Sequence, residues 1–217
     1  IAPTADRLFL VGDLFEFWFE YRTVVPKGFV RILGKLAEMR DAGILIEAFT
    51  GNHDLWMFGY FEQELGIPVH KNPIRTSIGQ KDFFIGHGDG LGPGDRGYKC
   101  MKKVFVHPLS QRLFRSIHPD LGVRMAHYFS NLSRRATPPE EREWLGEERE
   151  WLYQYCLRKI AQGVEPDYFV FGHRHLPIDV TLPNGRSRYV NLGEWMYRCS
   201  YAEFDGSELA LRYWERE

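Results

Sequence analysis

YFVFGHRH, residues 168–175, is an apolar run that ends in a glycine and two histidines. Three other stretches have the same design, namely LFLVGD (8–13), LIEAFTGNHD (45–54) and DFFIGHGD (82–89). Continuous apolar runs of this length, bounded by glycine, are typical of strands buried on both faces in parallel or mixed sheets. The repeated pattern therefore predicts an α/β fold in which several strands end in Asp, Asn or His.

Helical periodicity separates the first two of these runs. The apolar residues there recur at helical spacing, at Phe29, Ile32, Leu33, Leu36 and Met39. Gly43 follows where a helix would end, so the first part of the chain predicts a β-α-β unit.

A long helix is also expected before the fourth run. It would begin at Thr137, with Pro138 and Glu140 in its first turn, and present Leu145, Leu152, Tyr155, Cys156 and Ile160 on one face.

Beyond Leu176, the pairs Asn184-Gly185 and Asp205-Gly206 mark tight turns between short alternating runs. We therefore expect antiparallel strands in the C-terminal part.

Length and composition exclude several classes of protein. We take all 217 residues as one domain, and a net charge of −1 argues against a general nucleic-acid binder. The cysteines, Cys100, Cys156 and Cys199, lie too far apart for a disulfide framework and fit a reducing cytosol. No apolar run approaches the roughly 20 residues that span a bilayer. The prediction is a cytoplasmic protein that at most lies on a membrane surface.

Polar residues that follow adjacent strands meet at the carboxyl edge of a sheet, where α/β proteins bind ligands. The four runs provide a carboxylate, an amide oxygen and imidazoles there, from Asp13, Asn52, His87, His173 and His175. This mixed set suits Mn²⁺, Fe²⁺ or Zn²⁺. A single histidine at a strand end is more often structural, but the four endings together predict a metal centre.

The motifs G-D, G-N-H-D, G-H-G-D and G-H-x-H, in this order, resemble those of the calcineurin-like metallophosphoesterases over nearly the whole chain. The resemblance implies a sandwich of mixed β-sheets flanked by helices, with two divalent metal ions, Mn²⁺ foremost, at the strand ends. It assigns Asn52, His87 and His173 to one ion and His175 to the other. Asp13 would bridge both.

The resemblance also implies catalytic roles and the reaction. His53 would support the phosphate or the leaving oxygen and would be held by Asp54. Two dications at such a site activate water and neutralise phosphoryl oxygens, which implies hydrolysis of a phosphoester or pyrophosphate.

One motif of the family has no counterpart in this sequence. The family opens with Asp-x-His on its first strand, which gives the second metal its remaining ligands, and nothing before Asp13 matches it. We therefore expect residues upstream of Ile1 to be missing and the second metal site to be incomplete here.

More specific stretches resemble the UDP-2,3-diacylglucosamine diphosphatases of lipid A synthesis. They are GDLFEFWFEY (12–21), HGDGLGPGDRGYK (87–99), the insert at 106–135 and NLGEW (191–195). One departure is His53, because the best-characterised lineage of these enzymes has arginine there. Arginine is a permanent bidentate phosphate clamp whereas imidazole titrates, so the exact substrate stays open.

The insert, about residues 100–135, is predicted to be a helical cap punctuated by Pro108 and Pro119. From Arg96 to Arg135, Asp120 is the single acidic residue among many basic ones, namely Arg96, Lys99, Lys102, Lys103, Arg112, Arg115, Arg124, Arg134 and Arg135. Basic amphipathic helices suit an anionic membrane surface or an acyl chain held beneath a lid. Helices that merely dock on the core would give the same pattern.

The resemblance implies an acylated UDP-sugar as substrate and peripheral binding to the cytoplasmic face of the inner membrane. Its substrate contacts would come from Asp95, Tyr98, Trp18, Leu113 and Phe129, although Trp18 suits the core equally well. Leu109, Met125 and Leu132 are further candidates for the walls of an acyl chamber.

Three alternatives stay open at this point. The first is another small-molecule phosphodiesterase or phosphatase on the same scaffold, which would lack an apolar chamber at the metals. The second is a binding module without catalysis, which would leave the metal site empty. The third, a nuclease, would need a basic groove, and the neutral remainder of the chain offers little support for one. The sequence does not determine the oligomeric state.

Overall fold

The computed structural model describes residues 4–94, 96–136, 143–144 and 146–214. The chain divides into two compact units, and both are discontinuous in sequence. Unit 1 comprises Ile1–Asn72 and Gly97–Ala136, and unit 2 comprises Pro73–Arg96 and Thr137–Glu217. None of the helices in these described ranges combines the length and apolar character that crossing a membrane requires.

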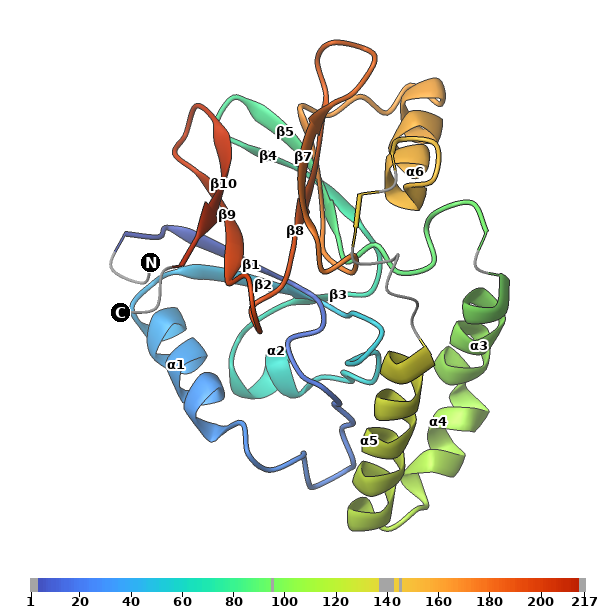
Figure 1. Ribbon diagram of the computed structural model, residues 1–217. Helices are drawn as coiled ribbons and strands as arrows, with labels where there is room; N and C mark the ends of the chain where they lie inside the picture. Colours follow the sequence, from blue (N-terminus) through green and yellow to red (C-terminus); the bar gives the residue numbers. More distant parts are fainter. Residues whose placement is uncertain (1–3, 95, 137–142, 145, 215–217) are drawn as a thin grey trace. The chain divides into compact units, whose positions relative to one another are not determined.

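Unit 1 contains a parallel sheet with helices packed against it (Figure 1). Its strands are β1 (Arg7–Val11), β2 (Leu45–Phe49) and β3 (Val69–His70), and its first helices are α1 (Val30–Asp41) and α2 (Tyr60–Glu64). β1 and β2 are parallel neighbours joined through α1, which confirms the predicted β-α-β unit.

The core of unit 1 is rich in aromatic side chains. Leu36 and Met39 of α1, two members of the predicted helical stripe, pack here with Ile46 of β2 and Phe61 of α2. Trp18 lies among them, with its ring 4.4 Å from that of Phe15. Burying one such side chain contributes about 1.5–3 kcal/mol, so this cluster fixes α1 and α2 on the sheet.

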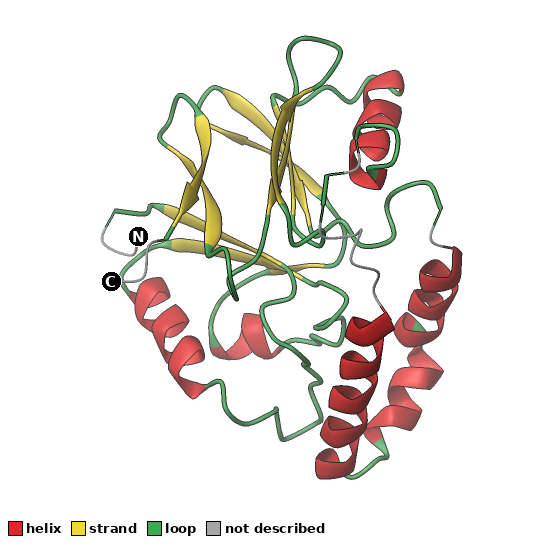
Figure 2. Cartoon of the chain, viewed as in Figure 1, coloured by secondary structure: helices red, strands yellow, loops and turns green. Residues whose placement is uncertain are grey.

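Three helices occupy the region of the predicted insert: α3 (Arg96–Val106), α4 (Pro108–Arg115) and α5 (Pro119–Ala136) (Figure 2). Both prolines stand at the first position of a helix, where a missing N–H costs nothing. His107 caps α4 by accepting a hydrogen bond from Leu109 N at 3.2 Å. The two prolines thus separate three helices in the region where the sequence predicts a helical cap.

The insert packs on the aromatic segment that follows Asp13. The ring of Phe114 lies 4.8 Å from that of Phe19 and 4.7 Å from that of Trp56. Trp56 Nε1 also donates to Phe105 O at 2.9 Å. The helices and the loop after β1 therefore form one packed assembly within unit 1.

We predict that Gly122→Ala destabilises the protein, although alanine favours a helix by about 1 kcal/mol over glycine. A Cβ at Gly122 in α5 would lie 2.5 Å from Tyr21 Oη and 3.2 Å from Phe114 Cζ. Overpacking of this kind costs about 1–3 kcal/mol. Urea denaturation should show the loss, and Tyr21→Phe should restore part of it in the double variant. A Gly122→Ala protein more stable than the parent would contradict this packing.

Unit 2 is built on a five-stranded mixed sheet in the order β4-β5-β6-β8-β7. The strands are β4 (Ile74–Ile78), β5 (Lys81–Gly86), β6 (Tyr168–Phe171), β7 (Pro177–Thr181) and β8 (Arg188–Leu192). β5, β6 and β8 run parallel, with β4 and β7 antiparallel at the edges. All residues of β6 are buried, as its uninterrupted apolar run predicts.

The C-terminal strands correct one expectation in part. The hairpins β7–β8 and β9 (Ser200–Phe204) with β10 (Leu209–Tyr213) are antiparallel as predicted. However, β8 also pairs with β6 in parallel, so it belongs to the central sheet. The turn residues Asn184 and Gly185 predict the pairing of β7 with β8. They carry no information about the strand on the other side of β8, which is β6.

The helix before β6 is shorter than the sequence predicts. α6 (Trp151–Ala161) begins only at Trp151, because Gly146 has a φ of +92° and residues 147–149 form a turn. Leu152 and Cys156 of the predicted stripe are buried against the sheet. The expected start, with Thr137, Pro138, Glu140 and Leu145, lies outside the described residues.

Candidate metal centre

In unit 1, the loop after β1 and the G-N-H-D loop after β2 lie in contact. Asp13 Oδ1 accepts a hydrogen bond from His53 N at 2.9 Å. A Cβ at Gly51 would lie 2.2 Å from the same oxygen, so only glycine allows this approach. The parallel pairing of β1 and β2 thus brings the first two motifs together, with Asn52 between Gly51 and His53.

Asp54 holds the two loops together through their backbones. Its side chain is fully buried and accepts hydrogen bonds from Gly51 N at 2.6 Å, Leu14 N at 2.8 Å and Asp13 N at 3.3 Å. Hydrogen bonds of this kind compensate a buried carboxylate for the loss of water. Because the donors are backbone N–H groups, they also hold the carboxylate in one position. Asp54 therefore positions the backbone that carries both Asp13 and His53.

The imidazole of His53 has neighbours that the sequence did not predict. Its Nδ1 lies 3.0 Å from Glu16 O and 3.5 Å from Ser130 Oγ. A carbonyl only accepts, so Nδ1 carries a proton and Nε2 is left for other partners. Ser130 also donates to the Glu16 carboxylate, which links helix α5 to this loop. Glu16 stands three positions after Asp13, but no pattern in the sequence identifies Ser130.

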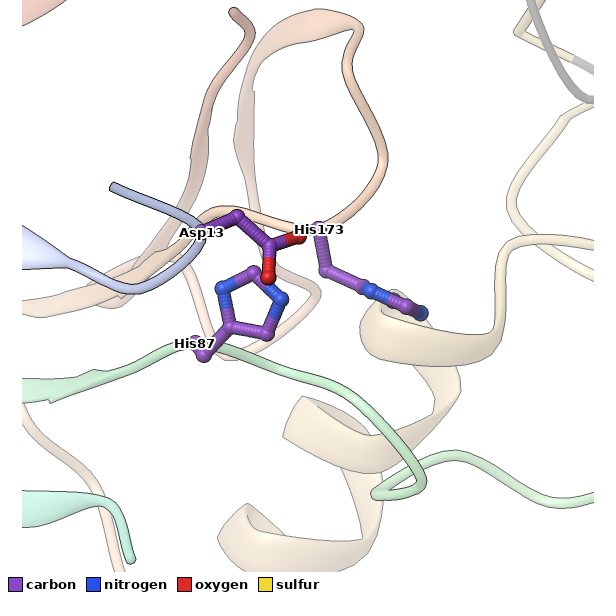
Figure 3. A group of neighbouring side chains, drawn as sticks. All are labelled: Asp13, His87 and His173. Carbon is purple, nitrogen blue, oxygen red and sulfur yellow. The ribbon is translucent and has the colours of Figure 1, made fainter. Parts of the chain in front are cut away.

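In unit 2, the third and fourth motifs meet at the ends of two neighbouring parallel strands. His87 follows β5 and His173 follows β6, and Gly86 pairs with Phe171 across the two strands. Their ring centroids lie 5.1 Å apart, and a ring nitrogen of each lies within 4.8 Å of one of the other (Figure 3). Two imidazoles at this separation fit the coordination of one divalent ion.

Several candidate ligands adopt a rare backbone conformation. Asp13, His173 and His175 have φ values of 51°, 67° and 52°. Residues other than glycine seldom occupy this left-handed region, and those that do cluster at functional sites. Backbone geometry therefore marks the same residues as the sequence motifs do.

Glu194, from the NLGEW stretch, is a charged neighbour of His175. Burial raises the pKa of its carboxyl, but backbone N–H groups of Tyr197, Arg198 and Met196, together with the charge of His175, bring the net pKa below its usual value. The side chain of His175 is exposed, in contrast to the half-buried His173 and the buried His87.

The structure places the expected substrate contacts in different surroundings. Tyr98 is half-buried in α3, and Asp95 lies outside the described residues. Leu113 and Phe129 are 61% and 59% exposed. Trp18 is fully buried in the core and donates to Glu20 Oε1 at 3.0 Å, so it is a core tryptophan rather than the border of a substrate pocket.

No family model matches this chain. It is 39% identical over 228 residues to a UDP-2,3-diacylglucosamine hydrolase from Porphyromonas gingivalis, covering 99% of this chain and 86% of that protein. It is 27% identical over 207 residues to the hydrolase of that name from Ectopseudomonas mendocina, covering 94% and 83%.

Solved structures give more distant likenesses. Vps29 from Entamoeba histolytica, complexed with zinc, is 14% identical with a TM-score of 0.37, over 94% of this chain and 89% of that one. An archaeal phosphodiesterase is 12% identical with a TM-score of 0.40, over 85% and 76%. The family assignment therefore rests on the sequence relatives and on the motifs at the strand ends. On this evidence the chain belongs to the UDP-2,3-diacylglucosamine hydrolase family.

Proposed function

We propose that the protein is a metal-dependent hydrolase that cleaves the pyrophosphate of UDP-2,3-diacylglucosamine at its α-phosphorus. The products would be UMP and 2,3-diacylglucosamine 1-phosphate. The observation that carries this proposal is the 39% identity to the Porphyromonas gingivalis hydrolase over 99% of the chain. The metal motifs at the ends of β1, β2, β5 and β6 support it independently.

In this proposal, the metal ligands are Asp13 and Asn52 in unit 1 and His87, His173 and His175 in unit 2. Mn²⁺ is the first metal to test. Carboxylate, amide and imidazole donors together suit Mn²⁺, Fe²⁺ or Zn²⁺, and the His87–His173 pair supports a shared ion. When bound, such ions neutralise phosphoryl oxygens and lower the pKa of water.

The chain's own residues would orient the phosphate and handle the proton. Because His53 Nδ1 donates to Glu16 O, Nε2 would be the atom that contacts the phosphoryl or leaving oxygen. Asp54 keeps this imidazole in place through the backbone of residues 51–54. Asp95 and Tyr98 would contact the rest of the substrate.

The insert would bind the acyl chains. Large apolar side chains on α4 and α5 are more than half exposed, at Leu109, Leu113, Leu121, Tyr128 and Phe129. Exposed apolar residues in such a group mark a binding surface. Burial of an acyl chain contributes about 0.8 kcal/mol per CH₂, so ten methylenes would dominate recognition. The basic residues of these helices would hold the protein at the anionic cytoplasmic face of the inner membrane.

The test compares two substrates, the acylated UDP-sugar and a small aryl phosphodiester, each assayed with Mn²⁺. We expect hydrolysis of both by the parent protein. Leu113→Glu should lower turnover of the lipid substrate at least about 100-fold. A charge in the acyl site prevents several methylene groups from being buried, and their binding free energy is lost. It should leave the aryl phosphodiester unaffected.

Val30→Glu is the matched control, since Val30 is 77% exposed on α1 and outside the insert. It should change neither activity. Cleavage of only the aryl phosphodiester by the parent would indicate a different small-molecule substrate, and cleavage of neither would contradict catalysis. Equal losses on both substrates in a folded Leu113→Glu protein would assign Leu113 a structural role.

A further inference from the structure

We propose that the ion pair between Glu150 and Arg174 is a positioning device for the turn that carries His173 and His175. The inference rests on the proposed function, because it assumes that these histidines bind metal. The observations behind it are separate, since they are contacts within unit 2 of Glu150, which lies outside the family motifs, and of Arg174, the variable position of G-H-x-H.

The turn after β6 needs external support. Within it, His173 and His175 both have left-handed backbone conformations, with φ of 67° and 52°. Such strained residues persist only where the surrounding contacts over-determine them. Arg174 lies between the two histidines, so a contact that holds Arg174 restrains the backbone from which both imidazoles project.

Arg174 is fixed by a buried carboxylate. Its Nε donates to Glu150 Oε2 at 2.9 Å, and the two side chains are 18% and 2% exposed. Tyr189 Oη donates to the other oxygen of Glu150 at 3.3 Å, so both carboxylate oxygens have donors. Arg174 Nη2 also donates to Glu143 O at 3.3 Å.

The Glu150 carboxylate is held at the start of helix α6, which packs in the core of unit 2. Glu150 is the N-cap residue of α6, and Leu152 and Tyr153 in the first turn of this helix are buried in the core of unit 2. Leu152 also packs beside the G-H-G-D loop, where a Cβ at Gly88 would lie 2.9 Å from Leu152 Cδ1. The start of α6 therefore connects the loops that carry His87 and His173.

A second contact holds the same turn from the opposite end. Asn191, fully buried in β8, donates from Nδ2 to Gly172 O. The backbone is thus held at Gly172 and the side chain at Arg174, on either side of His173. Groups that orient metal ligands in this way commonly change metal affinity about 10- to 100-fold when they are replaced.

Burial of the pair also argues for positioning over stability. A buried ion pair is weak evidence for net stability, because desolvation offsets its attraction. The fixed position of Arg174, by contrast, directly restrains the backbone of its neighbours His173 and His175. Arg174 contacts no reacting group in this proposal and acts only through the histidines.

The experiment measures Mn²⁺ affinity of the whole protein by calorimetry, beside its melting temperature without metal. We expect Glu150→Gln to weaken Mn²⁺ binding about 10- to 100-fold. Arg174→Met should have the same effect, and the double variant should be no worse than either alone. Arg174→Lys, which retains the charge, should recover part of the affinity.

Two matched controls separate positioning from stability. Tyr189→Phe removes a different hydrogen bond from Glu150 and should leave Mn²⁺ affinity within about twofold, since Arg174 keeps its partner. Asp179→Asn breaks the Arg188–Asp179 ion pair elsewhere in unit 2 and should lower only the melting temperature.

Unchanged Mn²⁺ affinity in folded Glu150→Gln would overturn the inference, as would an equal loss in Asp179→Asn. If Glu150→Gln does not fold, the comparison of Arg174→Met with Arg174→Lys decides in its place. A parent protein that binds Mn²⁺ but does not hydrolyse the UDP-lipid would refute the proposed function alone. A parent that binds no Mn²⁺ would overturn both.

Discussion

Replacing His173 with alanine should lower Mn²⁺-dependent hydrolysis of both the UDP-lipid and the aryl phosphodiester by at least about 10³-fold. A metal ion supplies several kcal/mol of transition-state stabilisation, and each 1.36 kcal/mol corresponds to a tenfold rate. His173 is the proposed partner of His87 at one ion, with their rings 5.1 Å apart. The measurement is kcat/KM on both substrates, together with Mn²⁺ affinity.

Two further variants make this result interpretable. His173→Gly tolerates the left-handed backbone at this position and offers no ligand atom, so its loss of activity reports the ligand and not strain. His118→Ala replaces an imidazole that is 74% exposed and should change neither activity nor Mn²⁺ affinity. Full activity in a folded His173→Ala protein would refute the assignment of this ligand.

Asp54→Ala should produce the largest loss of stability. Its fully buried carboxylate accepts hydrogen bonds from three backbone N–H groups, at Gly51, Leu14 and Asp13. Leaving such buried donors unsatisfied costs on the order of 3–4 kcal/mol in total, so the melting temperature should fall by about 10 °C. Because these loops carry Asp13 and His53, activity should fall at least about 100-fold in the folded fraction.

Asp205→Ala is the matched control for this variant. Asp205 Oδ1 also accepts three hydrogen bonds, from Ser207 N, Ser207 Oγ and Glu208 N, but on an exposed turn. These donors, Glu208 N foremost, lower the pKa of Asp205 from 3.8 to about 2. Its stabilisation is present above pH 3.8 and is lost as the pH falls towards 2.

The two variants differ in the burial of the carboxyl group that is removed, since Asp54 is fully buried and Asp205 is exposed. We expect Asp205→Ala to lower the free energy of unfolding much less than Asp54→Ala, with no change in activity. Equal losses would show that the number of hydrogen bonds, and not the burial of the acceptor, determines the effect.

The sequence by itself determined the strands and the chemistry at their ends. Buried strands such as β6 need uninterrupted apolar runs, and a turn at a strand end needs glycine, so both are written in consecutive residues. Asp13, Asn52, His87, His173 and His175 stand directly after these runs, which is why their types and order predict a metal site. The β-α-β unit of unit 1 was predictable for the same local reason.

Only the tertiary structure decided which distant residues support these motifs. Ser130 reaches His53 from 77 positions away, and Arg174 meets Glu150 across 24. Trp18 is buried in the core although its sequence position, five residues after Asp13, suits a pocket equally well. β8 takes its parallel place beside β6, and α6 starts late at Trp151, where Glu150 turns to meet Arg174. These features depend on packing between segments far apart in the chain, which no local pattern of residues encodes.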